Sequence, residues 1–177
     1  MLRLFVAIRP PETVRAQLLA AMGGVAGARW QGDDQLHLTL RFIGEVHRHL
    51  AEDVHAVLCA VRYPPFDIAV AGIGSFERRG EATALWAAVA PQEKLRTLHK
   101  KIDQALIRAG VEPDRRAYVP HVTLARLPRG AGPIGPFLQA AGPLAGPPFT
   151  VEDFCLYESR LAPEGAVYTI VARYPLG

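Results

Sequence analysis

The chain has 177 residues, and no long polar or low-complexity stretch divides it, so we expect one compact domain. Hydrophobic residues make up 50% of the sequence and charged residues 21%, which excludes an intrinsically disordered protein and predicts a soluble globular one. The formal net charge of +3 permits an anionic partner but does not imply one.

The N-terminal apolar run at residues 4–8 is too short for a signal-peptide core, and Arg9 ends it, so we interpret it as a strand. The two cysteines, Cys59 and Cys155, are too few for a disulfide framework and indicate a reducing compartment, the cytoplasm. No segment predicts contact with a membrane. No feature predicts a protein partner, so we expect a monomer.

Hydrophobic periodicity and helix-breaking residues predict five elements in the first half of the chain. In order they are a strand at residues 2–8, a helix at 12–22, a strand at 36–43, a helix at 50–61 and a hairpin of 66–76 with 83–90. Gly44 closes the second strand, and Pro64 with Pro65 prevents the second helix from continuing.

The second half of the chain repeats this order at nearly constant offsets. Residues 85–93 resemble 4–12 at an offset of 81, His121 follows His37 by 84, and 149–159 resemble 66–76 at an offset of 83. We infer an internal duplication of approximately residues 1–82 and 83–177. The alternative is two generic α/β units.

The predicted fold is α+β and bilobal. Two pseudo-symmetric lobes each contain a small, mainly antiparallel sheet with helices outside, and a cleft lies between them. A stretch rich in glycine and proline at residues 130–148 predicts a loop with one helical turn at 137–141.

One short motif occurs in both halves, as His37-Leu-Thr39-Leu and as His121-Val-Thr123-Leu. Residues i and i+2 of a strand point to the same face, so each histidine shares a face with its threonine. If an approximate two-fold axis relates the lobes, these polar faces meet in the cleft. Two imidazoles and two hydroxyls then surround one small anion.

This arrangement suits the hydrolysis of a phosphodiester. An imidazole with a pKa of about 6.5 is a base when neutral and an acid when protonated. One histidine takes a proton from the attacking water and the other protonates the departing oxygen, each effect worth about 10²- to 10⁴-fold in rate. We expect Thr39 and Thr123 to donate hydrogen bonds to the phosphate oxygens. The scheme requires no metal and no cofactor.

A single copy of the motif is weak evidence, because a half-buried histidine that bonds a neighbouring carbonyl is commoner than a catalytic one. For either strand alone, the sequence therefore predicts a structural histidine. Two copies at equivalent places in a repeated order favour a paired active site instead.

The sequence also resembles a known family in segments spread over nearly the whole chain. These are residues 3–8, 29–30, 37–45, 85–86, 120–126 and 156–159, with Gly165 and Tyr168. The family is the bacterial and archaeal RNA 2′,3′-cyclic phosphodiesterases, also called 2′-5′ RNA ligases, of the two-histidine phosphoesterase superfamily. The resemblance implies that the substrate is RNA or a nucleotide with a 2′,3′-cyclic phosphate and that the product is a 2′-phosphate. It also implies that His37 is the proton donor to the 3′ oxygen and that His121 is the base for water.

Arg126 is the candidate cation for phosphate, because a guanidinium binds phosphate in a forked geometry. Strand alternation places it on the face opposite Thr123 unless the strand bends, so the resemblance supports this role and the period does not. Arg41 and Phe42 are candidate substrate contacts. Alternation places Arg41 on the face of His37, where it either lines the cleft or is solvated at the strand end.

Phe42 and Trp30 either stack on a base of single-stranded RNA or pack in the core. His99 is interpreted as part of a solvated basic face that attracts RNA. A polar cluster at the second helix is interpreted as solvated and not as a metal site. Its members are His47, His49, Glu52, Asp53 and His55.

Three functions are to be distinguished. The first is the cyclic phosphodiesterase, with reversible 2′-5′ RNA ligation as a subsidiary activity of the same residues. The second is a protein that binds RNA ends without turnover. The third is a metal-dependent hydrolase built on the histidine-rich helix. Turnover in the presence of a chelator favours the first.

Overall fold

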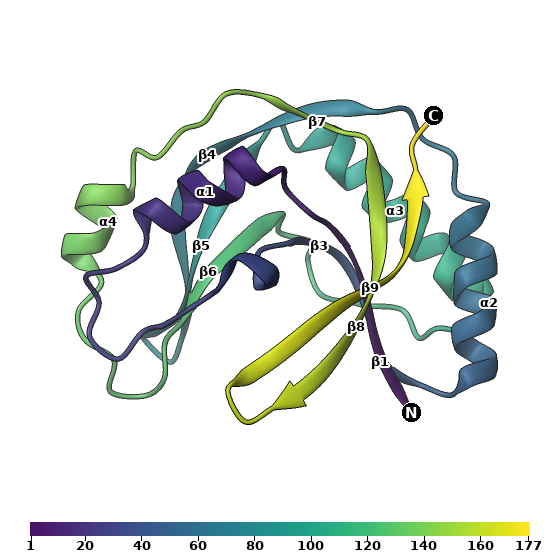
Figure 1. Ribbon diagram of the computed structural model, residues 1–177, viewed down its shortest axis with the longest axis horizontal. Coiled ribbons are helices and arrows are strands. Elements are labelled where there is room, and N and C mark those ends of the chain that lie inside the picture. Colours follow the sequence, from purple (N-terminus) through teal and green to yellow (C-terminus); the bar gives the residue numbers. More distant parts are fainter.

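The computed structural model describes residues 1–177 and has an α+β fold with four helices, one 3-10 turn and nine strands (Figure 1). The strands are β1 (Leu2–Ile8), β2 (Arg29–Trp30), β3 (Leu38–Val46), β4 (Phe66–Arg78), β5 (Glu81–Ala90), β6 (His121–Arg126), β7 (Phe149–Val151), β8 (Asp153–Ala162) and β9 (Gly165–Pro175). The helices are α1 (Glu12–Ala21), α2 (Arg48–Cys59), α3 (Glu93–Arg108) and α4 (Gly135–Ala141), and the 3-10 turn is η1 (Asp33–Gln35). The predicted fold class is confirmed.

Apolar periodicity explains how the helices pack. Leu95, Leu98, Ile102 and Leu106 of α3 recur three or four residues apart and are fully buried, so one face of this helix lies in the core. The short helix α4 is the helical turn that the sequence predicted within its glycine- and proline-rich stretch. No helix of the chain combines the length and the apolar character needed to cross a membrane.

The strands pair antiparallel in one continuous path, β7-β4-β5-β6-β3-β1-β8-β9, and β2 pairs with β6. We predicted two small sheets, and the structure differs because β3 and β6 pair at one position, Leu38 opposite Val122. This pair joins the group β3, β1, β8 and β9 to the group β6, β5, β4, β7 and β2. The antiparallel character is as predicted.

Each group of strands contains segments from both halves of the chain. β4, from the first half, pairs with β5, and β8, from the second half, pairs with β1. The predicted hairpins β4–β5 and β8–β9 are both present. The two groups of strands therefore do not coincide with the two halves of the sequence. The duplication of residues 1–82 and 83–177 stays a prediction.

The two faces of the sheet carry separate apolar clusters. Leu4, Val6 and Ile8 of β1 belong to the large core, whereas Phe5 and Ala7 of the same strand belong to a small second cluster. We call these sides the core face and the open face. In Figure 1, α2 and α3 lie at one end of the sheet and α1 and α4 at the other, while the β8–β9 hairpin extends away from the helices.

Candidate active site

The two predicted histidines lie beside the pair that joins β3 and β6. His37 immediately precedes Leu38, His121 immediately precedes Val122, and these two apolar residues are opposite each other. Thr39 of the first motif and His121 of the second line the same cavity, and the charge of His121 contributes to a lowered pKa of His37. The structure therefore brings the two motifs together.

The backbone orients both imidazoles in the same way. Nδ1 of His37 lies 2.7 Å from the carbonyl oxygen of Gln35, and Nδ1 of His121 lies 2.6 Å from that of Val119. A carbonyl oxygen only accepts, so we assign the hydrogen to Nδ1, which donates it. Nε2 of each ring is then the base in the neutral form and the acid in the protonated form.

Burial keeps both imidazoles neutral in the substrate-free protein. The pKa of His37 is lowered to about 4, mainly by desolvation and also by the charges of His121 and Arg126. Desolvation likewise lowers the pKa of His121, and Arg126 acts in the same direction. An anion between these groups raises both histidine pKa values, because it stabilises the imidazolium form. The site is therefore suited to an anionic ligand.

Aromatic rings pack against each imidazole. The ring centre of Phe5 lies 4.8 Å from that of His37, and Tyr168 meets His37 edge-on at 5.1 Å. Phe76 meets His121 edge-on at 4.9 Å. These contacts restrict rotation of both imidazoles, which fixes the direction in which each Nε2 points.

A bulge in β6 brings Arg126 to the face of its histidine. Ala84 and Trp86 lie two apart in β5, whereas their partners Arg126 and Thr123 lie three apart in β6. Residues 84–86 of β5 alternate regularly, so Arg126 and Thr123 share the open face. Simple alternation placed Arg126 on the opposite face, and the extra residue of the bulge reverses this.

A corresponding bulge in β3 has the opposite consequence for Arg41. Val6 and Ala7 are adjacent in β1, whereas their partners Arg41 and Thr39 are two apart in β3. Arg41 therefore shares the core face with Val6 and is 4% exposed. Phe42 turns to the open face. The prediction that Arg41 shares the face of the first histidine is wrong, because the bulge shifts the alternation by one residue.

The guanidinium of Arg41 is held by the protein itself. Its Nε donates to Oδ1 of Asp103 at 2.6 Å, its Nη2 donates to the carbonyl oxygen of Glu112 at 2.6 Å, and its Nη1 donates to that of Phe42. Asp103 belongs to α3, and Glu112 lies in the loop before β6. Arg41 therefore has a structural role, because its guanidinium links β3 to helix α3 and to the loop before β6.

A cavity of about 250 Å³ lies beside His121. Its aromatic and polar lining residues are Thr39, Arg41, Phe42, Phe76, His99, Asp114, Arg116, Tyr118 and His121. Phe42 is 49% exposed, and the guanidinium of Arg116 lies 6.0 Å from its ring centre. Arg116 also pairs with Asp114 at 2.8 Å. An exposed aromatic ring beside groups that donate and accept hydrogen bonds suits a nucleobase.

His99 lies in the wall of this cavity and not on the solvated face that the sequence predicted. Its ring stacks on Tyr118 with centres 4.0 Å apart, and its Nδ1 lies 2.6 Å from the carbonyl oxygen of Leu40. The hydroxyl of Tyr118 donates to the carbonyl oxygen of Thr39 at 3.0 Å. These contacts hold the backbone of the β3 bulge. Helical spacing in the sequence could have indicated this position, because His99 follows the buried Leu95 by one turn and lies on the same side of the helix.

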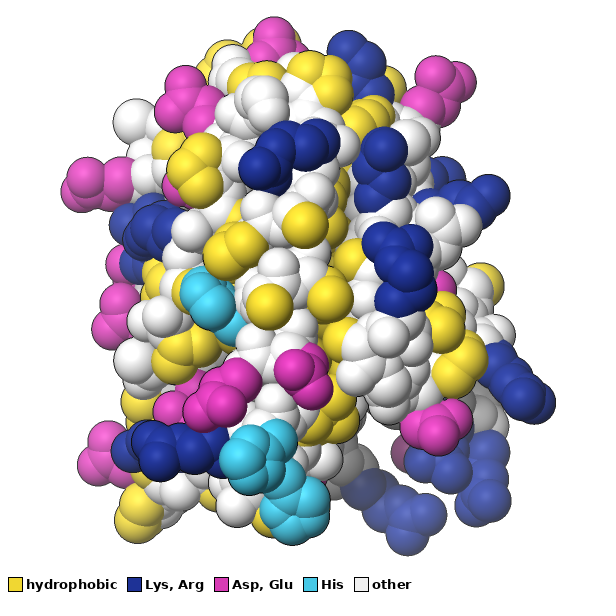
Figure 2. All heavy atoms as spheres, turned by 90° about the vertical axis from the view of Figure 1, so that its right-hand side faces the viewer, with side chains coloured by type: hydrophobic (Ala, Val, Ile, Leu, Met, Phe, Trp, Pro, Cys, Tyr) yellow, Lys and Arg dark blue, Asp and Glu magenta, His cyan; other side chains and the backbone are white.

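The remaining residues singled out in the sequence lie elsewhere. Trp30 packs against Phe137 of α4 with ring centres 5.3 Å apart, so its predicted core packing is confirmed. In the polar cluster of α2, Nδ1 of His55 lies 2.8 Å from the hydroxyl of Tyr174. No group of three or more His, Cys, Asp or Glu side chains is arranged to hold a metal ion. Basic, acidic and histidine side chains are interspersed on the side of the molecule that Figure 2 shows.

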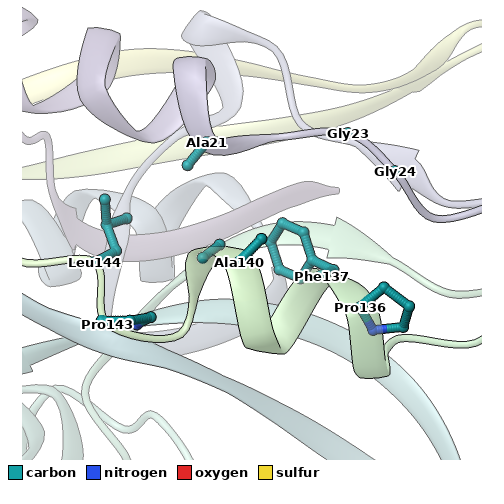
Figure 3. A pocket seen from close by; sticks show the side chains of 9 residues that line it. Ala21, Gly23, Gly24, Pro136, Phe137, Ala140, Pro143 and Leu144 are labelled. Atoms are coloured by element: carbon teal, nitrogen blue, oxygen red, sulfur yellow. The ribbon is translucent and has the colours of Figure 1, made fainter.

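A cavity larger than the one beside His121 lies away from the histidines. It has a volume of about 540 Å³, lies between the end of α1 and α4, and is lined by Ala21, Gly23, Gly24, Pro136, Phe137, Ala140, Ala141, Pro143 and Leu144 (Figure 3). None of these side chains is an acid, a base or a nucleophile. Cavity size therefore does not locate the chemistry in this protein.

A match to a protein family covers both histidine motifs. The family model of the 2′-5′ RNA ligase superfamily matches residues 9–162. The chain belongs to this superfamily. The family to which the sequence segments pointed is therefore confirmed.

Curated relatives of this superfamily member are named RNA 2′,3′-cyclic phosphodiesterase. The relative from Thermus thermophilus is 34% identical, and the match covers 99% of this chain and 90% of that protein. The relative from Archaeoglobus fulgidus is 28% identical, with coverages of 94% and 96%. A relative from Geobacillus stearothermophilus is 29% identical over 97% of this chain, which spans 56% of that protein's length.

Solved structures share the fold. A crystal structure of a Thermus thermophilus protein matches with a TM-score of 0.80 and 28% identity, over 98% of this chain and 97% of that one. Escherichia coli LigT, crystallised with 3′-AMP, matches with a TM-score of 0.78 and 26% identity, over 99% of this chain and 98% of that one. The superfamily assignment therefore holds for the three-dimensional structure as well as for the sequence.

Proposed function

We propose that this protein hydrolyses a 2′,3′-cyclic phosphate at the end of RNA, or on a nucleotide, to a 2′-phosphate, with His37 and His121 as acid and base. One observation carries the proposal. Each imidazole is held at Nδ1 by a backbone carbonyl, which leaves both Nε2 atoms for a ligand next to Arg126. The names of the curated relatives support the substrate, and the 3′-AMP complex of LigT supports a nucleotide as the kind of ligand.

The two histidines divide the proton transfers. Nε2 of neutral His121 accepts a proton from water as the water oxygen bonds to phosphorus. The bond between phosphorus and the 3′ oxygen breaks, and Nε2 of protonated His37 donates its proton to that oxygen. The products are a 2′-phosphate and a 3′-hydroxyl. Exchange of one proton with solvent at each ring restores the starting state. The choice of donor and acceptor follows the family resemblance.

His37 receives its proton together with the substrate. Its pKa of about 4 keeps it neutral in the empty cleft at pH 7. The negative charge of the cyclic phosphate favours the imidazolium form and raises the pKa. Substrate binding and protonation of the acid are therefore coupled, and the free protein does not hold an uncompensated imidazolium.

Thr39, Thr123 and Arg126 bind the oxygens of the phosphate. The threonines share the open face with their histidines, and the bulge in β6 brings Arg126 to the same face. Hydroxyl and guanidinium donors in a half-buried site stabilise the negative charge that develops on these oxygens in the transition state.

Phe42 stacks on the terminal base. The ring is exposed in the cavity beside His121, and the guanidinium of Arg116 lies close to it. Aromatic rings bind bases of single-stranded RNA in this way because every base offers a stacking face. Arg41 lines the same cavity, but its guanidinium donors are engaged within the protein, so we assign it a role in positioning Phe42 and not a direct substrate contact.

Three further properties belong to this proposal. The protein acts as a monomer. Reversible 2′-5′ RNA ligation is a subsidiary activity of the same residues, in which a 5′-hydroxyl oxygen bonds to phosphorus in place of water, the bond to the 3′ oxygen breaks, and the two histidines transfer the same protons. The protein works in the cytoplasm, which agrees with two free cysteines, one exposed and one buried.

Turnover separates this proposal from a protein that only binds RNA ends. A short RNA with a 2′,3′-cyclic phosphate is incubated with the protein in EDTA, and opening of the ring is followed by phosphorus NMR. The account predicts catalytic ring opening that the variants His37→Ala and His121→Ala lack. Stoichiometric binding without ring opening would support the binding protein. Activity that EDTA abolishes would support the metal-dependent hydrolase.

A further inference from the structure

Arg29 and Arg126 lie directly opposite each other in the paired strands β2 and β6. Opposite residues of antiparallel strands project to the same face, so both guanidinium groups belong to the open face. Neither arginine has a carboxylate partner among the ion pairs of the protein. Two like charges placed opposite each other destabilise a sheet. The pair is therefore better explained by an anionic ligand than by stability.

Contacts of the neighbouring residues fix the position of Arg29. Trp30 packs against Phe137, and the amide of Gln31 donates to the carbonyl oxygen of Leu124 at 2.8 Å. The short strand β2 is thus anchored by its apolar neighbour and by its backbone. Arg29 itself is exposed. An exposed cation on an anchored strand is preorganised to bind an anion.

Arg126 and Phe42 lie in opposite directions from the centre of the cleft. β3 and β6 are antiparallel and meet where Leu38 faces Val122, so Phe42 follows this point in one direction and Arg126 in the other. With the base at Phe42 and the cyclic phosphate at the two histidines and Arg126, the neighbouring Arg29 is left for another part of the substrate. In RNA, the next charged group is the phosphodiester that precedes the terminal nucleotide.

We propose that Arg29, beside Arg126, binds this preceding phosphodiester and makes the protein favour RNA oligonucleotides over cyclic mononucleotides. The inference rests on the proposed function, because it takes the cyclic end to lie between the two histidines. A forked guanidinium suits a phosphodiester, and two of them at one end of the cleft offer more donors than one phosphate contact requires.

The test compares two substrates, a short RNA ending in a 2′,3′-cyclic phosphate and the mononucleotide 2′,3′-cyclic CMP. Arg29→Gln removes the contact, and Arg48→Gln, at an exposed position at the start of α2, removes the same charge elsewhere. We expect Arg29→Gln to lower kcat/KM for the oligonucleotide about tenfold, through KM, and to leave the mononucleotide unchanged. The dependence of log KM on log salt should become shallower by about 0.7 for the oligonucleotide. The variant Arg48→Gln should change neither value.

Equal losses on both substrates would place Arg29 at the cyclic phosphate and overturn the inference, as would an unchanged oligonucleotide rate. The unfolding midpoint of Arg29→Gln should equal or exceed that of the unmodified protein, because a like-charge pair is removed. If the unmodified protein turns over neither substrate, the proposed function fails. Fluorescence anisotropy of the labelled oligonucleotide then decides the inference: weaker binding by Arg29→Gln than by Arg48→Gln supports it, and equal binding overturns it.

Discussion

Phe42 and Arg126 occupy corresponding places in the two histidine strands. Each follows the threonine of its motif by three residues, and each reaches the open face because a bulge intervenes. A bulge in each strand thus places an aromatic ring on one side of the histidines and a cation on the other. The two strands therefore carry different residues at corresponding positions. Phe42 is suited to a base and Arg126 to a phosphate.

Loss of either imidazole should strongly lower the turnover rate without unfolding the protein. We expect His37→Ala and His121→Ala each to lower kcat by about 10²- to 10⁴-fold, because each removes one general acid or base. The measurement is steady-state hydrolysis of an RNA with a cyclic end, with circular dichroism to verify folding. His49→Ala is the matched control, since the side chain of His49 is 98% exposed on α2. Unchanged activity of His37→Ala or His121→Ala would show that the substituted histidine is not the general acid or base.

Acid should destabilise the protein through His37. Its pKa in the folded protein is about 4, below the ordinary value of about 6.5, so the unfolded chain binds more protons between these values. Stability is therefore lost as the pH falls from about 6.5 to about 4. We expect the variant His37→Gln, whose side chain does not titrate, to lose less stability over this range. Urea unfolding at several pH values measures the difference, and identical pH profiles would contradict a neutral, half-buried imidazole at His37.

The exposed ring of Phe42 should contribute to substrate binding and little to stability. Base stacking on an aromatic ring is worth about 1–3 kcal/mol, so Phe42→Ala should raise KM by about 5- to 150-fold. Leu161→Ala is a control of similar character, because Leu161 is 83% exposed at the end of β8. An unchanged KM for Phe42→Ala would show that the base binds elsewhere.

Arg41 and Arg126 should respond in opposite ways to the same substitution. Arg41→Met breaks a buried ion pair with Asp103 and should lower the free energy of unfolding by about 3–5 kcal/mol. Arg126→Met should leave stability nearly unchanged and lower kcat/KM, because it removes a phosphate contact from the open face. Denaturant titration and steady-state kinetics of both variants make the comparison. An Arg41→Met protein of unchanged stability with a raised KM would show that Arg41 contacts the substrate.

The sequence predicted the elements and the two histidines because apolar periodicity and motif spacing are local properties. It placed Arg41 on the wrong face and left Arg126 uncertain, since a bulge is defined by how two distant strands pair. Pairing of distant strands also explains why two sheets were predicted. The pair of Leu38 with Val122 joins β3 to β6, so the strands form one sheet. His99 was missed because its partners, Tyr118 and the backbone of β3, come from distant parts of the chain.

The most direct test of the central claim is the position of the phosphate on the product. RNA ending in a 2′,3′-cyclic phosphate is converted in the presence of EDTA, and the product is compared with authentic 2′- and 3′-phosphates. The account predicts only the 2′-phosphate, because His37 protonates the 3′ oxygen as the leaving group. A 3′-phosphate would contradict the assigned leaving group, and the absence of any product would contradict catalysis by the two histidines.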